Sequence, residues 1–246
     1  MIGRSDDQKM AGSAQLDAWF AAQGWTPQLF QREVWTHMAE GRSGLLNAPT
    51  GTGKTYAVWG GVVNHALLHH SKTLGLKAIW ITPLRALAGE IAESAQRMCD
   101  GVGLDWKVGA RTGDTSTKER AAQKKALPQL LVTTPESLHV LLATKGYAEL
   151  FKHLDWFIAD EWHELLGSKR GVQVELALSR LKALRPQLGI WGISATIGNL
   201  EEAMTVLHGT DIVDRTRSVD PPGRPTGADR PIPVLVRSTI RKPIEV

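Results

Sequence analysis

From residue 45 onward, short apolar runs alternate with longer segments of helical periodicity, and no other feature restricts the fold as much. Parallel strands need a crossover connection, usually a helix, so this alternation is typical of a parallel sheet flanked by helices. Several of the runs are almost continuously apolar, as in strands buried on both faces. We therefore predict an α/β fold with a mostly parallel central sheet and helices on both faces. The predicted strands are Leu45–Asn47, Ala78–Thr82, Trp106–Arg111, Leu130–Thr133, Phe157–Asp160 and Ile190–Ser194.

The helical pattern is clearest in Gly171–Arg185, where apolar residues recur at i, i+4 and i+7. These residues are Val174, Leu178 and Leu181. Pro186 ends this helix because it cannot continue the backbone hydrogen bonding. Two further helices are predicted before the sheet, at Gln15–Gln23 and Gln31–Ala39.

Composition excludes several classes of protein. The single cysteine, Cys99, can form neither an internal disulfide nor a cysteine-based zinc site, and we expect it to fill space in the core. No apolar run approaches the ~20 residues that span a bilayer, and the amino terminus lacks the apolar stretch of a signal peptide. We therefore expect a cytoplasmic protein without membrane contact, associated with the nucleoid if the source is bacterial. The net charge of +4 is compatible with a polyanionic partner but does not require one.

The segment Ala48–Thr55, with the sequence APTGTGKT, follows an apolar run and precedes a helical one, as a phosphate-binding loop must. Glycines allow backbone N–H groups and a helix N-terminus to approach phosphate oxygens closely. Lys54 is expected to reach the β- and γ-phosphates of ATP, and the Thr55 hydroxyl to bind Mg²⁺. The predicted nucleotide-binding residues of this loop are Thr50, Gly51, Thr52, Gly53, Lys54 and Thr55.

A second motif, Asp160-Glu161-Trp162-His163, lies at the carboxyl end of an apolar run, where open α/β sheets place their ligands. We expect Asp160 to hold Mg²⁺ and Glu161 to polarise the water that attacks the γ-phosphate. Both motifs together favour an ATP hydrolase in which Lys54, Asp160 and Glu161 are catalytic.

These motifs resemble those of superfamily 2 helicases of the DExH-box type, and the resemblance covers most of the chain. It implies a RecA-like P-loop domain that uses ATP and Mg²⁺. The segments Gly24–Pro27 and Phe30–Gln31 resemble the family's Q motif, which implies that Gln31 recognises adenine. Trp25 or Trp162 is a candidate for stacking on adenine or on a base.

Three loops resemble the family's nucleic-acid contacts. They are Thr82–Leu87, which looks like motif Ia, Arg111–Asp114, and Thr133–Ser137, which looks like motif Ib. The resemblance implies contacts with the nucleic-acid backbone rather than with bases. Together with two charged residues that follow the acidic motif, the implied contact residues are Pro83, Arg85, Arg111, Thr112, Gly113, Thr134, Pro135, Glu136, Lys169 and Arg170.

The run Ser194-Ala195-Thr196 resembles motif III, which implies that Ser194 and Thr196, with His163, couple the γ-phosphate site to the nucleic acid. The run Glu164–Gly171 is similar to the large-helicase-related group. Within that group the chain most resembles the ligase-associated DEXH-box helicases. This resemblance implies 3′-to-5′ DNA translocation, a setting in DNA repair, and a repair nuclease or ligase as a possible partner.

We expect three parts: residues 1–40, a helical segment with the Q motif; 41–212, the first RecA-like lobe; and 213–246, a Pro/Gly-rich tail that leads towards a second RecA-like lobe. The tail holds Ser218–Arg230, rich in proline and glycine, and nothing in the chain matches the second lobe. Two alternatives stay open, an ATP-dependent RNA remodeller and a nucleotide-gated binding module. DNA is favoured over RNA by the resemblance alone.

Overall fold

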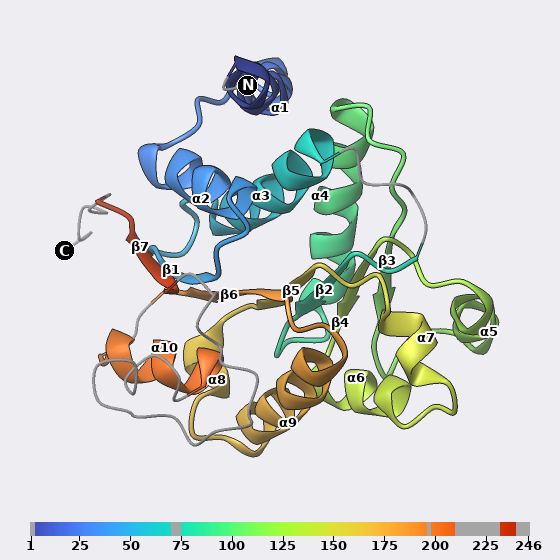
Figure 1. Ribbon diagram of the computed structural model, residues 1–246. Coiled ribbons are helices and arrows are strands. Elements are labelled where there is room, and N and C mark those ends of the chain that lie inside the picture. Colours follow the sequence, from blue (N-terminus) through green and yellow to red (C-terminus); the bar gives the residue numbers. More distant parts are fainter. Residues whose placement is uncertain (1–2, 70–74, 196–197, 210–231, 240–246) are drawn as a thin grey trace.

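The structure, a computed structural model, describes residues 3–69, 75–195, 198–209 and 232–239. Seven strands of this part form one parallel sheet in the order β3-β4-β2-β5-β6-β1-β7 (Figure 1). The predicted α/β fold with a parallel central sheet is therefore confirmed. The strands are β1 Gly44–Asn47, β2 Ala78–Ile81, β3 Val108–Arg111, β4 Leu130–Thr133, β5 Trp156–Ala159, β6 Gly189–Ser194 and β7 Val234–Arg237.

Helices cover both faces of the sheet, so the sheet separates two hydrophobic cores. In Figure 1, α1 to α4 lie on one face and α6 to α10 lie on the other. The helices are α1 Gly3–Ala22, α2 Leu29–Ala39, α3 Lys54–Leu68, α4 Leu87–Gly101, α5 Thr117–Lys125, α6 Pro135–Leu142, α7 Tyr147–Phe151, α8 Trp162–Leu165, α9 Lys169–Leu184 and α10 Leu200–His208.

All six predicted strands are present, each within two residues of its predicted bounds. The largest difference is at β3, because Trp106 does not pair in the sheet but is buried against Trp59, with ring centroids 6.2 Å apart. The helix predicted at Gly171–Arg185 begins at Lys169, since the Ser168 side chain caps it by accepting from the backbone N–H of Gly171.

The strand β7 lies in the segment that we expected to lead away as a tail. It pairs in parallel with β1, with Val234 beside Gly44. A Cβ on Gly44 would lie 2.6 Å from the Val234 carbonyl oxygen, so glycine permits this pairing. At least these four residues of the segment therefore belong to the same sheet. Ser218–Arg230 lies outside the described residues.

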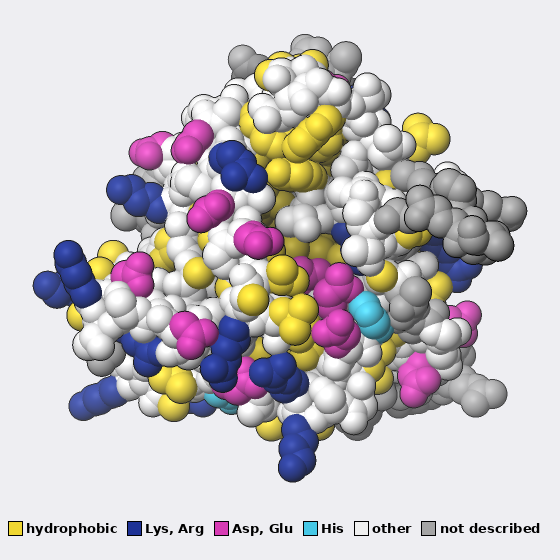
Figure 2. All heavy atoms as spheres, turned by 180° about the vertical axis from the view of Figure 1, so that it is seen from behind, with side chains coloured by type: hydrophobic (Ala, Val, Ile, Leu, Met, Phe, Trp, Pro, Cys, Tyr) yellow, Lys and Arg dark blue, Asp and Glu magenta, His cyan; other side chains and the backbone are white. Residues whose placement is uncertain are grey.

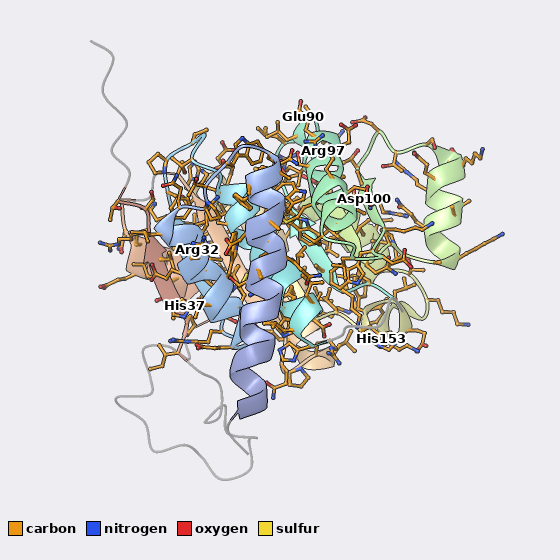
Figure 3. All side chains as sticks on the ribbon, turned by 90° about the horizontal axis from the view of Figure 1, so that it is seen from above. Arg32, His37, Glu90, Arg97, Asp100 and His153 are labelled. Atoms are coloured by element: carbon orange, nitrogen blue, oxygen red, sulfur yellow. The ribbon has the colours of Figure 1, made fainter. Side chains whose placement is uncertain are left out.

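The helix pair α2 and α3 packs closely and thereby places the Q-motif region against the phosphate loop. A Cβ on Gly60 would lie 2.5 Å from Nε1 of Trp35, and one on Gly61 would lie 2.3 Å from Sδ of Met38. The two glycines thus leave room for the Trp35 and Met38 side chains between the helices. Viewed from above, α1 lies across these helices (Figure 3), and Arg32 of α2 holds it through an ion pair.

Candidate functional site

The phosphate-loop candidate joins β1 to α3 with the backbone geometry that such a loop requires. Gly51 and Gly53 have φ angles of 77° and 85°, in the left-handed region that favours glycine. A Cβ on Gly53 would also lie 2.8 Å from Nε2 of Gln31. Thr52 donates from its hydroxyl to the Pro49 carbonyl at 2.7 Å. The ordered loop therefore presents the N-terminus of α3, where anions are stabilised.

The two motifs of the predicted ATP site come together in the structure, although 107 residues separate them. Nζ of Lys54 lies 3.4 Å from Oε1 of Glu161. This follows from the strand order, because β5, β6 and β1 are neighbours whose carboxyl ends meet at one edge. Glu161 has φ 44°, the only positive φ of a non-glycine residue in the described part of the chain. Such a conformation is strained, and strained residues concentrate at functional sites.

Asp160 is buried at the end of β5, with both carboxylate oxygens hydrogen bonded. Oδ1 accepts from the backbone N–H of Glu161 at 2.9 Å, and Oδ2 accepts from Nε1 of Trp80 at 3.1 Å. Burial and the neighbouring Glu161 charge raise the pKa of Asp160 to about 6, against the opposing effects of these two bonds and of Lys54. The carboxylate is thus destabilised in the isolated protein, and a cation beside it would favour its charged form.

Trp80, inside the predicted strand Ala78–Thr82, has a contact that the local sequence does not reveal. The residue is fully buried, and its indole N–H needs a partner, which is Asp160. Trp80 pairs in register with Ile158, two residues before Asp160, on the neighbouring strand β5. Predicting this contact would require knowing that β2 pairs with β5 and in which register, and the local sequence does not give this pairing.

The oxygens at this edge fit a magnesium ion. Hard cations prefer oxygen ligands, and Mg²⁺ is usually held by one or two carboxylates together with substrate phosphates. The Asp160 carboxylate and the half-buried Thr55 hydroxyl supply such oxygens. Oε2 of Glu161 is buried, and no hydrogen-bond partner is found for it among the described residues. It lies 3.5 Å from Nδ1 of His163, within ion-pair distance if that histidine is protonated.

His163 connects the acidic motif to the end of β6. Its Nδ1 lies 3.0 Å from Oγ of Ser194, which is fully buried. The structure therefore brings together three predicted elements: the phosphate loop, the acidic motif and the serine of motif III. Thr196, the third predicted coupling residue, lies outside the described residues.

The structure places the Gln31 amide against the phosphate loop. Nε2 donates to the Gly53 carbonyl at 3.1 Å, while Oε1 accepts from the backbone N–H of Gln28 at 2.8 Å. The side chain is 3% exposed. Trp25 is 46% exposed and lies against Tyr56, with ring centroids 5.4 Å apart, so its outer face is available for stacking.

Trp162, in contrast, cannot stack on adenine or on a base as we had considered. Its ring is fully buried, and Nε1 donates to the Ala203 carbonyl of α10 at 2.9 Å. The residue fixes α8 to the core, and the stacking hypothesis for Trp162 is wrong.

The three loops predicted to contact nucleic acid follow β2, β3 and β4, so they share the edge of the sheet that carries the ATP-site residues. Arg85 is exposed, and its guanidinium lies over Gly113, since a Cβ there would be 2.9 Å from Nη1. Lys169 is also exposed. Figure 2 shows the face opposite to that of Figure 1. Basic side chains gather at the lower left of this face, while acidic side chains and a histidine lie nearer its middle.

Several of the predicted contact residues are buried, Pro83 among them. Arg111 is 5% exposed, and its Nη1 donates to Oε1 of Gln123 at 3.3 Å. Thr134 is 1% exposed and caps α6. In this conformation both side chains stabilise the loops. The Arg111 guanidinium is therefore not exposed for the predicted contact with nucleic acid. Thr112 and Pro135 are buried as well, whereas Gly113 is exposed.

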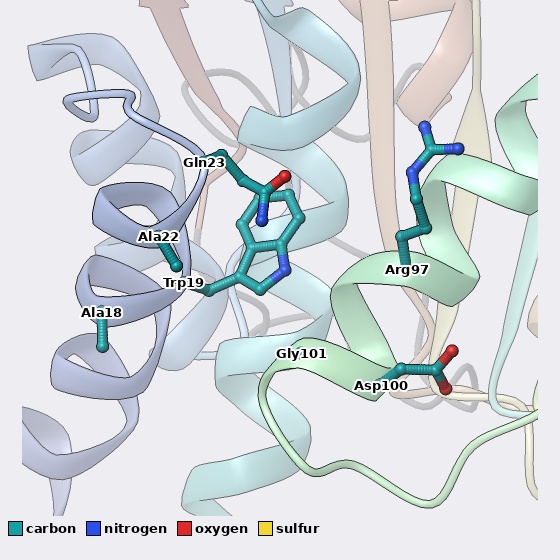
Figure 4. Close-up of a pocket in the computed structure, with 7 residues that line it drawn as sticks. All are labelled: Ala18, Trp19, Ala22, Gln23, Arg97, Asp100 and Gly101. Carbon is teal, nitrogen blue, oxygen red and sulfur yellow. The ribbon is translucent and has the colours of Figure 1, made fainter.

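A shallow depression between α1 and α4 lies apart from this edge (Figure 4). Trp19, Gln23 and Arg97 are among the residues that line it, and none of the predicted site residues does. It is therefore not part of the candidate ATP site.

A family model described as DEAD/DEAH box helicase matches residues 28–203, which include the phosphate loop, the acidic motif and Gln31 of the Q motif. The chain belongs to this helicase family. It is 29% identical to the Lhr helicase/uracil glycosylase of Escherichia coli over 92% of this chain and 14% of that protein. It is 31% identical to the ATP-dependent helicase Lhr-Core protein 2 of Thermococcus barophilus over 78% of this chain and 24% of that protein. The predicted similarity to the large-helicase-related group is thus confirmed.

Solved structures agree with this assignment. The helicase Lhr of Mycobacterium smegmatis, bound to single-stranded DNA and AMP-PNP, superposes with a TM-score of 0.74 at 28% identity and covers 92% of this chain and 27% of that chain. The match confirms a RecA-like helicase lobe. The chain spans less than a quarter of the length of the curated relatives named above. Within the described residues, no helix is long and apolar enough to cross a membrane.

Proposed function

We propose that this helicase-family chain is the N-terminal ATP-binding lobe of an ATP-dependent 3′-to-5′ DNA helicase or translocase that acts in DNA repair. The observation that carries the proposal is the 3.4 Å approach of Lys54 to Glu161, which joins the phosphate loop to the acidic motif in one site. A lysine and an acidic pair at this edge are the parts that ATP hydrolysis requires.

Each residue of the site has a role in this proposal. Lys54 binds the β- and γ-phosphates, Thr55 and Asp160 hold Mg²⁺, and Gln31 and Trp25 bind adenine. When bound, the metal ion neutralises charge that develops on the phosphates. The remaining loop residues, Thr50, Gly51, Thr52 and Gly53, enclose the phosphates with their backbone N–H groups.

The Lys54–Glu161 pair suggests how the site changes when nucleotide binds. Without nucleotide, the ammonium of Lys54 pairs with the Glu161 carboxylate. A triphosphate would compete for Lys54 through its larger negative charge and leave Glu161 without that partner. The carboxylate is then available to take a proton from the attacking water. His163 and Ser194, with Thr196, would report the state of this site to the nucleic acid.

Nucleic-acid binding by this lobe alone should be weak, near the ~10⁻⁴–10⁻⁶ M typical of electrostatic, sequence-independent association. Hydrolysis should also be slow, because an arginine from a second lobe is typically worth ~10³–10⁵ in rate. In our proposal residues 1–40 carry the Q motif and 41–212 form the ATP-binding lobe. Residues 213–246 lead to the second lobe after contributing β7. Unwinding requires that second lobe.

DNA is the proposed substrate because one relative is named a DNA helicase and the similar Mycobacterium smegmatis structure is bound to single-stranded DNA. A relative from Methanococcus vannielii, 34% identical over 72% of this chain, is named ATP-dependent DNA helicase Hel308. Two relatives are named for uracil glycosylase as well as helicase, which supports a repair setting with a nuclease or ligase as a possible partner.

The test compares ATP hydrolysis by the full-length protein with single-stranded DNA, with RNA of the same sequence, and without nucleic acid. We expect stimulation by DNA to exceed stimulation by RNA, and Glu161→Gln to retain ATP binding while losing turnover and translocation. Stronger stimulation by RNA would replace the DNA proposal with an RNA remodeller. Full function of the Glu161→Gln variant would leave only a nucleotide-gated binding module.

A further inference from the structure

Arg170, in the first turn of α9, contacts both of the loops that resemble motifs Ia and Ib. Its Nε lies 2.7 Å from Oε1 of Glu136, in the first turn of α6. Its Nη1 donates to the carbonyl oxygen of Pro83 at 2.9 Å, directly after β2. The planar guanidinium makes these two contacts in different directions, which a lysine ammonium does poorly. One side chain therefore joins segments that are 34 and 87 residues away in the sequence.

The start of α9, which carries Arg170, packs against α8, the helix that follows Asp160 and Glu161 of the acidic motif. The Ser168 hydroxyl donates to the Leu165 carbonyl of α8 at 2.6 Å and accepts from the backbone N–H of Gly171 at 3.1 Å. A Cβ on Gly171 would lie only 2.2 Å from the Leu165 carbonyl oxygen. The start of α9 is thus packed directly on α8, the helix that carries His163. A shift of α8 would move the Arg170 backbone with it.

The charges argue against a simple role of Arg170 in binding phosphate. Its side chain is 40% exposed and that of Glu136 is 37% exposed, so the pair lies at the surface with a net charge near zero. A carboxylate beside a phosphate backbone repels it, and the arginine's charge is already used in the ion pair. Arg85 and Lys169, which are exposed on the same edge, are better placed to attract phosphates.

We propose that Arg170 is a positioning residue: it holds the Pro83 loop and the start of α6 in one nucleic-acid-binding surface and connects that surface mechanically to the acidic motif. The inference rests on the proposed function, because it assumes that these loops bind nucleic acid. It replaces the direct phosphate contact that the sequence led us to expect for Arg170 and Glu136.

The first experiment measures binding of this chain to fluorescein-labelled oligothymidine by anisotropy between about 50 and 200 mM salt. It compares wild type with Arg170→Ala, Arg170→Lys and Glu136→Ala, and uses Lys169→Ala as the reference for loss of a direct phosphate contact, because it removes a neighbouring exposed charge. Thermal unfolding of each variant verifies that it is folded. For a single strand, each phosphate contact contributes about 0.7 to the slope of log affinity against log salt.

If Arg170 is a positioning residue, Arg170→Ala weakens binding by about tenfold, the factor for roughly one charge-assisted hydrogen bond, with an unchanged salt slope. Arg170→Lys weakens binding similarly although it keeps the charge. Glu136→Ala also weakens binding although it removes a negative charge. A phosphate ligand gives the opposite pattern, which would overturn the proposal: a slope smaller by about 0.7, near-normal binding by Arg170→Lys, and tighter binding by Glu136→Ala.

The second experiment does not depend on nucleic acid and separates the two proposals. Hydrogen–deuterium exchange should become faster at residues 82–87 and 134–138 in Arg170→Lys, and it should remain as in wild type in Lys169→Ala. Unchanged exchange in both segments would refute the positioning role. If wild type fails to bind the oligonucleotide while exchange responds as expected, the nucleic-acid surface is wrong and the positioning role stands.

Discussion

Replacement of Asp160 by asparagine should make the stability of this protein less dependent on pH, and the structure gives the size of the effect. Burial, aided by the charge of Glu161, raises the pKa of Asp160 from 3.8 to about 6. A shift of about two units corresponds to about 3 kcal/mol of free energy between the two protonation states. The folded protein binds this proton more tightly than the unfolded chain does. The free energy of unfolding therefore falls as pH rises from about 4 to about 6 and stays low above that.

Asp160→Asn removes the titrating carboxyl group and introduces an amide. The N–H₂ of this amide is a donor, and it would face another donor, either the Trp80 indole N–H or the Glu161 backbone N–H. A buried donor left unpaired costs about 1–3 kcal/mol. The variant should therefore be less stable than wild type near pH 4. Its stability relative to wild type should then improve by about 3 kcal/mol by pH 7.

Urea unfolding of both proteins, without nucleotide or metal ions, across this pH range measures the difference directly. When both proteins also carry Glu161→Gln, the change of this stability difference with pH should be smaller. The reason is that the Glu161 charge is the second cause of the raised pKa of Asp160. A difference between Asp160→Asn and wild type that does not change from pH 4 to pH 7 would refute the reasoning. It would mean that Asp160 is neither desolvated nor close to Glu161 in solution.

Three further substitutions test separate contacts. Trp80→Phe removes the indole N–H that donates to Asp160 at 3.1 Å. It should lower the free energy of unfolding at pH 7, measured in urea, by about 1–3 kcal/mol. An unchanged free energy of unfolding would show that the bond is absent. Gly53→Ala should cost about 1–2 kcal/mol, because its φ is 85° and the new Cβ would meet Gln31, and should weaken ATP binding in a fluorescence titration. Normal ATP affinity in that variant would argue against this loop geometry. Trp162→Phe should lower the unfolding free energy by about 1–3 kcal/mol, because it removes the buried hydrogen bond to the Ala203 carbonyl and leaves space in the core, while ATP and oligonucleotide affinity stay near wild type. A selective loss of affinity would restore the stacking hypothesis.

The sequence predicted most of the fold because the strands are short, nearly continuous apolar runs separated by helical periodicity. It also predicted that the phosphate loop and the acidic motif meet, because parallel strands bring their carboxyl ends to one edge. The predicted start of β3 was less accurate, because Trp106 is apolar and suits a strand or a core contact equally well. Apolar character alone cannot distinguish these two positions.

What the sequence did not reveal depends on contacts between distant segments. The hydrogen bond from Trp80 to Asp160 requires the register of β2 on β5. The pairing of Arg170 with Glu136 requires the packing of α9 beside α6. The left-handed backbone of Glu161 is strained for a residue with a side chain, so no local preference predicts it. These features define the chemistry of the site more closely than the motifs do.

The most direct test of the account is equilibrium binding of a fluorescent ATP analogue to this chain, with and without Mg²⁺. The account predicts measurable affinity that Mg²⁺ strengthens, an Asp160→Asn variant that no longer responds to Mg²⁺, and a Lys54→Ala variant with little affinity in either condition. A folded wild-type sample without affinity for the analogue, or a Lys54→Ala variant that binds as tightly as wild type, would contradict it.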